Sequence, residues 1–154
     1  MIAKLIMELP EDVTQVRTAR RVGTCLLESA SVVPQDVEDV ELVIGEICTN
    51  VVRHARSEQG SYRLTLELHP DRLIVVVEDR GAGFDPSQLL FAPATLRPDG
   101  VEGGNRFGGL GLPLARALTD RLIFRETDPT GTTVYAEKVF RHAADKTGAK
   151  EALV

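Results

Sequence analysis

The sequence predicts an α+β fold, a two-layer α/β sandwich in which helices cover one face of a mixed, mainly antiparallel sheet. Two segments with helical spacing of apolar residues follow one another in the first third of the chain. Two strand-like segments then meet across a Pro70-Asp71 turn, as in an antiparallel hairpin. A second pair of strand-like segments lies near the C-terminus, so strands and helices do not alternate as they do in a parallel βαβ fold.

The first part of the chain predicts one strand followed by two helices. Residues 3–10 alternate weakly and predict a strand that ends at Pro10. Between Asp12 and Ser31, apolar residues recur at helical spacing. Pro34 begins a second helix that extends to about His54, because proline is tolerated in the first turn of a helix.

The remaining elements are a hairpin, a long glycine-rich segment, a short helix and a second hairpin. Residues 62–69 alternate strictly between apolar and polar side chains, and residues 72–79 form an aliphatic run that ends in two acids. Residues 80–109 are rich in glycine and proline, and a long segment of this kind is often a functional lid. A helix over 112–120 and strands over 121–127 and 132–139 complete the order.

Length and composition predict one domain over residues 1–140, followed by a polar, frayed tail over 141–154. The net charge of −5 argues against direct nucleic-acid binding, which depends on a basic surface. The longest aliphatic run, Leu73 to Val77, is too short to cross a membrane, and the N-terminus lacks the apolar core of a signal peptide. We therefore expect a cytoplasmic protein.

The cysteines and histidines show no pattern of a disulfide framework or a metal cluster. Cys25 and Cys48 lack paired spacing, so we expect two reduced, half-buried side chains. The three histidines are far apart and do not have the spacing of metal ligands.

The second predicted helix carries polar residues beside its apolar stripe. Glu46 and Asn50 are four residues apart and lie next to the edge of that stripe, Arg53 continues this flank, and His54 lies at the border with the stripe. Polar groups in this position can point into a cleft between helix and sheet. The alternative is an ordinary solvated flank, although asparagine is a poor residue for a helix interior.

Two glycine-containing segments indicate where a ligand could bind. In "VEDRGAGF", Asp79 ends a strand, and Gly81 and Gly83 would let the backbone approach a flat ligand. A carboxylate there can accept a hydrogen bond from an exocyclic amine such as that of adenine; the alternative is a plain turn. In the segment "GGNRFGGLGLPLARAL", residues 103–118, several glycines precede a helix, and the exposed N–H groups at such a helix start suit a phosphate. The alternative is a flexible loop that ends in an N-cap.

The better-known nucleotide motifs do not fit these segments. No GK[ST] follows the spaced glycines, as a P-loop requires. The position of the third Rossmann glycine holds Leu114, and the VAIK, HRD and DFG motifs of eukaryotic-type protein kinases are absent from the sequence.

Taken in order, the segments resemble the N, G1 and G2 boxes of the ATPase superfamily of gyrase, Hsp90, histidine kinases and MutL, which has the Bergerat ATP-binding fold. Glu46-x-x-x-Asn50 is similar to the N box, Asp79-x-Gly81-x-Gly83 to the G1 box, and residues 108–112 to the G2 box. The later "GTTV", residues 131–134, resembles the strand whose threonine helps to hold adenine. Within the superfamily, "ELVIGEICTNVVRHA" and "IVVVEDRGAGFDP" are most similar to anti-sigma-factor serine kinases.

The resemblance implies a site for ATP and Mg²⁺ between the second helix, the sheet and the lid. Glu46 would be the general base, and Asn50 would coordinate Mg²⁺. Asp79 would bind adenine with Thr133 nearby. The other implied nucleotide contacts are Gly81 and Gly83 near the base; Gly108, Gly109, Leu110, Gly111 and Leu112 around the phosphates; Arg53 and His54 along the triphosphate; and Arg106 at the γ-phosphate.

The implied activity is serine/threonine protein kinase activity toward a STAS-type anti-anti-sigma protein, combined with sequestration of a sigma factor, often by a homodimer. Arg17, Arg20 and Arg21 would face the partner, or else form a solvated helix face. One alternative is a nucleotide-dependent docking module without significant kinase activity. Another is the catalytic half of a histidine kinase, which we expect less because only a strand and a helix precede the N box.

Overall fold

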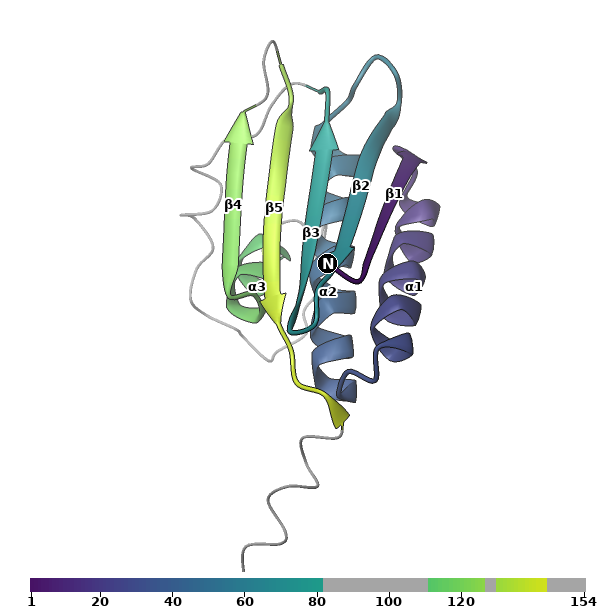
Figure 1. The fold of residues 1–154 in the computed structure, drawn as a ribbon. Helices are drawn as coiled ribbons and strands as arrows, with labels where there is room; N and C mark the ends of the chain where they lie inside the picture. Colours follow the sequence, from purple (N-terminus) through teal and green to yellow (C-terminus); the bar gives the residue numbers. More distant parts are fainter. Residues whose placement is uncertain (82–110, 127–129, 144–154) are drawn as a thin grey trace, which may run out of the picture.

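The computed structural model describes residues 1–81, 111–126 and 130–143. Within these ranges, the elements follow the predicted order, with three helices and five strands (Figure 1). They are β1 (Ala3–Pro10), α1 (Val13–Ser29), α2 (Pro34–His54), β2 (Ser61–Leu68), β3 (Arg72–Asp79), α3 (Gly111–Leu118), β4 (Arg121–Glu126) and β5 (Thr132–Val139).

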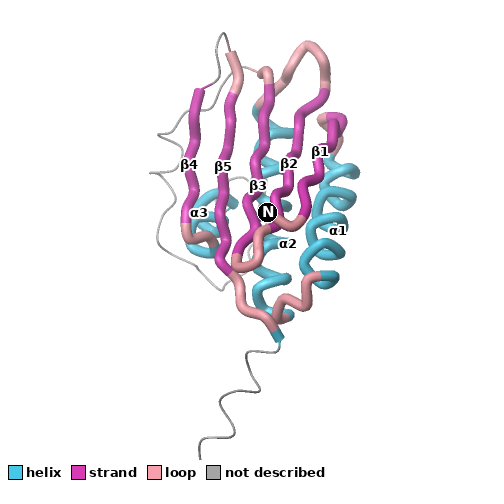
Figure 2. The backbone as a smooth tube through the Cα atoms, viewed as in Figure 1, coloured by secondary structure: helices cyan, strands magenta, loops and turns pink. Residues whose placement is uncertain are grey.

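The five strands form one sheet in the order β1-β2-β3-β5-β4. Each pairing in this sheet is antiparallel. The three helices lie together on one face, and no helix or strand of the described ranges covers the other face (Figures 1 and 2). The predicted α+β class and two-layer arrangement are therefore confirmed.

Local sequence signals explain where the two long helices begin. The side chain of Asp12 accepts a hydrogen bond from the Thr14 backbone N–H at 2.8 Å and so caps α1. Pro34 opens α2, where its missing N–H removes no helical hydrogen bond. None of the helices in the described ranges is long and apolar enough to cross a membrane.

The core lies between the inner face of the sheet and the apolar stripes of α1 and α2. Val43, Ile44 and Ile47 of α2 are almost fully buried there, as are Leu64 and Leu66 of β2. This stripe is the one that the helical spacing predicts.

The two cysteines are both free, but they differ in environment. Cys48 is buried in the core, and burial raises its thiol pKa to about 12. Cys25 is exposed on α1 rather than half-buried. Because a thiol with so high a pKa remains protonated at neutral pH, Cys48 acts as a small core residue.

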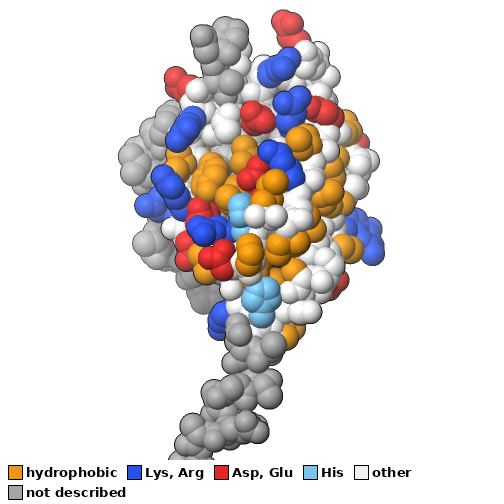
Figure 3. Space-filling view, viewed as in Figure 1, with side chains coloured by type: hydrophobic (Ala, Val, Ile, Leu, Met, Phe, Trp, Pro, Cys, Tyr) orange, Lys and Arg blue, Asp and Glu red, His pale blue; other side chains and the backbone are white. Residues whose placement is uncertain are grey.

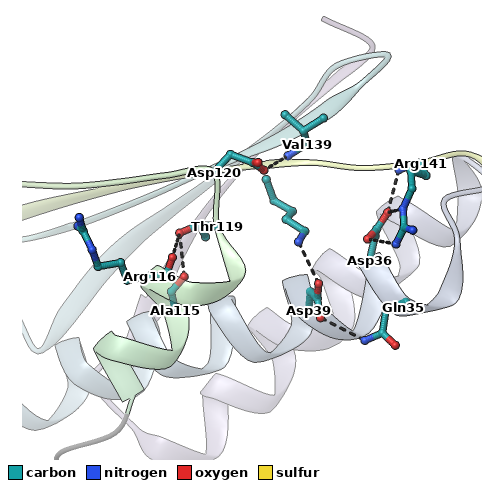
Figure 4. A network of polar contacts seen from close by, with 10 residues as sticks. Gln35, Asp36, Asp39, Ala115, Arg116, Thr119, Asp120, Val139 and Arg141 are labelled. Carbon is teal, nitrogen blue, oxygen red and sulfur yellow. Dashed lines mark hydrogen bonds and ion pairs between the residues drawn. The ribbon is translucent and has the colours of Figure 1, made fainter. Parts of the chain in front are cut away.

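The chain after β5 is bonded back to the start of α2 (Figure 4). The Arg141 backbone N–H donates to the buried Asp36 carboxylate at 2.8 Å, and the Arg141 guanidinium donates to the same group at 2.9 Å. The Lys138 ammonium pairs with Asp39 at 2.9 Å. Ala143 donates its backbone N–H to the Ser31 carbonyl. Residues 141–143 of the predicted tail are thus held against the domain, and 144–154 lie outside the described residues.

Candidate active site

A narrow pocket opens where α2, β3 and β5 meet. Helix α2 contributes residues of its C-terminal end, and β3 contributes its final residue. Strand β5 contributes the first two of its inward-facing side chains. The lining residues are Asn50, Val51, His54 and Ala55 from α2 and the residue after it, Asp79 from β3, and Thr132 and Val134 from β5.

Asp79 supplies a buried carboxylate to this pocket. Only 5% of the residue is exposed, and its Oδ1 accepts a hydrogen bond from the Gly81 backbone N–H at 2.8 Å. Burial raises the pKa of Asp79 and the nearby charge of Glu11 adds to this, whereas the backbone N–H groups of Gly81 and Thr132 act in the opposite direction; the net pKa is raised. An ionised carboxylate in an apolar recess is a strong acceptor for an amine donor.

Gly81 allows the end of β3 to lie directly against the end of α2. A Cβ at this position would collide with the backbone carbonyl of Ala55. Because the obstacle is backbone rather than a flexible side chain, only glycine fits without moving one element away from the other. This close approach places Asp79 beside Val51 and Ala55.

The threonine that lines the pocket is Thr132, whereas the family resemblance implies that Thr133 lies near the adenine. Thr132 is paired with Asp79 across β3 and β5 and is buried in the pocket. Thr133 pairs with Glu78 and so lies on the opposite face of the sheet. Alternation in β5, where Val134 and Ala136 are buried, identifies Thr132 as the inward residue.

Glu46 and Asn50 stand one helical turn apart at the rim of this region. Both are half-buried, and Asn50 lines the pocket. The Glu46 carboxylate lies against Gly111, the first residue of α3, where any Cβ would collide with Glu46 Oε2. The structure therefore brings the predicted N box beside the start of α3 and the end of β3.

The remaining predicted site residues fall into three groups. His54 is exposed and lines the same pocket as Asp79. Arg53 is half-buried and does not line this pocket. Leu112 belongs to α3, and its side chain is buried. The other predicted contacts, Gly83, Arg106, Gly108, Gly109 and Leu110, lie outside the described residues.

The chemistry of these groups suits a flat heteroaromatic base with an exocyclic amine, and beside it a hard cation. Val51, Ala55 and Val134 offer apolar walls, and Asp79 offers the acceptor. The amide oxygen of Asn50 is the kind of ligand that Mg²⁺ takes. Glu46, one turn away, offers a carboxylate that can accept a proton.

A second hollow of about 530 Å³ lies between α1 and α2 and carries positive charge. Arg17, Arg20 and Arg21 line it with Glu41, Thr49 and two valines, Val13 and Val16. The Arg20 side chain crosses Gly45, where a Cβ would collide with Arg20 Nε. This arginine groove thus begins at the residue next to Glu46.

Comparison with known proteins relates the chain to nucleotide-dependent kinases. The family described as the histidine kinase-like ATPase domain matches residues 9–138. The serine-protein kinase RsbW of Staphylococcus epidermidis is 31% identical over 128 residues, which cover 80% of each chain. The same-named kinase of Halalkalibacterium halodurans is 34% identical over 91 residues, 59% of this chain and 56% of that relative.

Solved structures agree in fold. The RsbU and RsbW domains of a Mycobacterium tuberculosis protein match 90% of this chain and 32% of that one, with a TM-score of 0.64 and 20% identity. A chain of the SiaB–SiaC complex from Pseudomonas aeruginosa has a TM-score of 0.63 and 16% identity, over 86% of this chain and 88% of that one. From its family match and its similarity to RsbW over most of its length, the chain belongs to the histidine kinase-like ATPase domain family, among relatives of the RsbW serine-protein kinases.

Proposed function

We propose that the chain is an Mg²⁺- and ATP-dependent serine/threonine protein kinase that phosphorylates a STAS-type anti-anti-sigma protein and also sequesters a sigma factor. One observation carries this proposal. Glu46 lies half-buried at the start of α3, one turn from Asn50, which shares a pocket with the buried Asp79. A half-buried carboxylate, an amide oxygen and a buried carboxylate are thereby close together, which supports the roles of base, metal ligand and adenine acceptor, and the RsbW relatives are named serine-protein kinases.

ATP would supply the transferred phosphoryl group. Asp79 would accept a hydrogen bond from the adenine amine, and Val51, Ala55 and Val134 would contact the faces of the ring. Asn50 would hold Mg²⁺ through its side-chain oxygen. These residues would orient the nucleotide, which is the larger part of catalysis in phosphoryl transfer.

Glu46 would act on the acceptor hydroxyl. Its carboxylate would take the proton as the hydroxyl oxygen forms a bond to the γ-phosphorus and the bond to ADP breaks. The base must therefore stand where the acceptor side chain enters. Its position against Gly111, at the rim rather than inside the apolar pocket, agrees with this role.

The arginine groove would be the docking surface for the protein partner. Arg17, Arg20 and Arg21 line it, and the Arg20 side chain lies over the residue next to Glu46. A partner with acidic side chains would therefore be attracted to the place from which its hydroxyl can reach the base.

The proposal is tested by isolating the partner and then measuring transfer. A pull-down from native lysate with and without Mg-ATP should recover a STAS protein or a sigma factor. With labelled ATP and the recovered STAS protein, Glu46→Ala should abolish transfer and leave ATP affinity nearly unchanged. Glu58→Ala, at an exposed position beyond α2, is the matched control. Transfer by Glu46→Ala at the wild-type rate would show that the assigned base is wrong.

The same assay separates the two alternatives. A docking module would bind ATP and its partner but transfer no label. A histidine kinase would give a product that loses its label in acid, whereas phosphoserine survives acid.

A further inference from the structure

The loop that joins α2 to β2, residues 55–60, begins at a wall of the proposed nucleotide pocket. Its first residue, Ala55, is buried and lines the pocket, and the Ala55 carbonyl lies against Gly81 just beyond β3. Figure 1 shows this loop at the same end of the sheet as the last residues of β1 and β3. A shift of the loop would therefore move the wall that stands beside Asp79.

The backbone of this loop adopts conformations that need support from outside. Arg56 has a φ of 45°, in the left-handed region that residues other than glycine rarely adopt. Gly60, at a φ of 62°, closes the loop and donates its N–H to the Ser57 carbonyl at 3.1 Å. Strained backbone of the kind seen at Arg56 persists where contacts with the surrounding structure fix it.

Glu11, at the junction of β1 and α1, supplies such contacts at two places in the loop. Its carboxylate accepts the Ser57 backbone N–H at 3.3 Å and also the Ser57 hydroxyl. Its own backbone N–H donates to the Gly60 carbonyl at 2.8 Å. Glu11 and Ser57 are both half-buried, and a charge-assisted hydrogen bond is stronger where water is partly excluded.

The same carboxylate also acts on the pocket through its charge. Burial is the largest cause of the raised pKa of Asp79, and the charge of Glu11 raises that pKa further. Charged side chains of both signs lie at this end of the molecule (Figure 3), but water and salt screen exposed charges. Because Glu11 is half-buried, its charge is screened less and reaches Asp79.

We propose that Glu11 is a positioning residue for the adenine base: through Ser57 it holds the loop whose Ala55 forms the wall of the pocket beside Asp79. This inference rests on the proposed nucleotide site and adds to it a residue that does not line the pocket. A loop that is already ordered costs less free energy to bind against, so the contact should increase affinity for the nucleotide.

Two substitutions break the contact without changing a residue of the pocket. Ser57→Ala removes the hydroxyl donor, and Glu11→Ala removes the acceptor. Calorimetry should show Mg-ATP binding weakened about tenfold in each, because the nucleotide must then order the loop. Glu11→Ala should also speed exchange of the Ser57 backbone amide about tenfold or more. Glu8→Ala and Ser29→Ala, at exposed positions on β1 and α1, are the matched controls and should bind as wild type does.

Glu11→Gln separates the contact from the charge. Glutamine keeps an oxygen that can accept from Ser57, so Mg-ATP affinity at neutral pH should stay within about threefold of wild type. Without the charge, the pKa of Asp79 should be lower, so the loss of ATP affinity at acidic pH should begin at a lower pH than in wild type. A merely structural role of Glu11 would not move this pH profile.

Three results would each overturn the proposal in a wild type that binds ATP. They are full Mg-ATP affinity in both Ser57→Ala and Glu11→Ala, unchanged amide exchange at Ser57 in Glu11→Ala, and an unshifted pH profile in Glu11→Gln. Circular dichroism and thermal unfolding would show that each variant is folded. A folded wild type that binds no ATP would instead overturn the proposed function, and amide exchange without nucleotide would still show whether Glu11 holds the loop.

Discussion

At the residue scale, Asp79 has opposite effects on stability and on ligand binding. Its folded-state pKa is raised, first by burial and then by the charge of Glu11. Its contribution to stability is therefore most favourable below the pKa of an unfolded aspartate, and it declines as pH rises through the folded value. At neutral pH the ionised side chain destabilises the nucleotide-free protein but is the form that accepts a hydrogen bond.

We predict that Asp79→Asn raises the melting temperature of the nucleotide-free chain at neutral pH and weakens ATP binding about ten- to a hundredfold. The amide removes the buried charge, but it is a poorer acceptor for the adenine amine. Thermal unfolding and calorimetry measure the two effects. Asp71→Asn, at an exposed turn, should change neither. Unchanged ATP affinity in Asp79→Asn would remove this carboxylate from the adenine site.

The raised pKa also predicts how ATP binding depends on pH. Protonation of Asp79 removes its charge, so ATP affinity should fall as pH drops through its folded pKa, which lies above the ordinary value of 3.8. Asp79→Asn should lack this dependence. Parallel loss of affinity in wild type and variant would assign the titration to another group.

At the element scale, two contacts join elements that are distant in sequence. One is the pairing of Asp36, at the start of α2, with Arg141 beyond β5 (Figure 4). Burial by itself raises the pKa of Asp36, but the hydrogen bonds and charge of Arg141, aided by Lys138, outweigh it, and the net pKa is lowered. The stability from this pairing is therefore present above the unfolded pKa and is lost as pH falls through the folded value.

We predict that Asp36→Asn lowers the free energy of unfolding by about 2 kcal/mol at neutral pH, because the charge-assisted hydrogen bonds are lost. Denaturant titration measures the loss. The difference from wild type should shrink as the pH approaches the folded pKa of Asp36. A difference that stays constant down to acidic pH would show that the ionised carboxylate is not its source.

The other contact is the close approach of β3 to α2 at Gly81. We predict that Gly81→Ala destabilises the fold by about 1–3 kcal/mol, since the added methyl meets the Ala55 carbonyl. Gly45→Ala is the comparison, because its Cβ would meet only the flexible Arg20 side chain. Equal losses of unfolding free energy in the two variants would show that the backbone contact is not tight.

At the scale of the whole molecule, the proposed site draws on both layers, so a bound nucleotide should stabilise the entire domain. We predict that Mg-ATP raises the melting temperature, with about 2.7 kcal/mol of added stability at a concentration a hundred times its dissociation constant. EDTA should remove part of this gain in wild type. In Asn50→Ala, EDTA should make no further difference, and a metal-dependent gain in that variant would exclude Asn50 as the metal ligand.

The order of elements and the main site candidates follow from the sequence because they rest on local signals. Helical spacing and Pro34 place α2, and the same spacing places Glu46 and Asn50 on one rim. A run of aliphatic residues ending in an acid places Asp79 at the edge of the sheet. Each of these features depends only on neighbouring residues.

Pairings between distant segments were decided only by the tertiary structure. The register of β3 with β5 selects Thr132 over Thr133, and the start of α3 meets Glu46 although 65 positions separate Gly111 from it. The Arg141 bond to Asp36 and the order of the five strands in the sheet arise in the same way. A periodic pattern determines which face of an element is buried, but the neighbour that buries it depends on long-range packing, which local spacing does not encode.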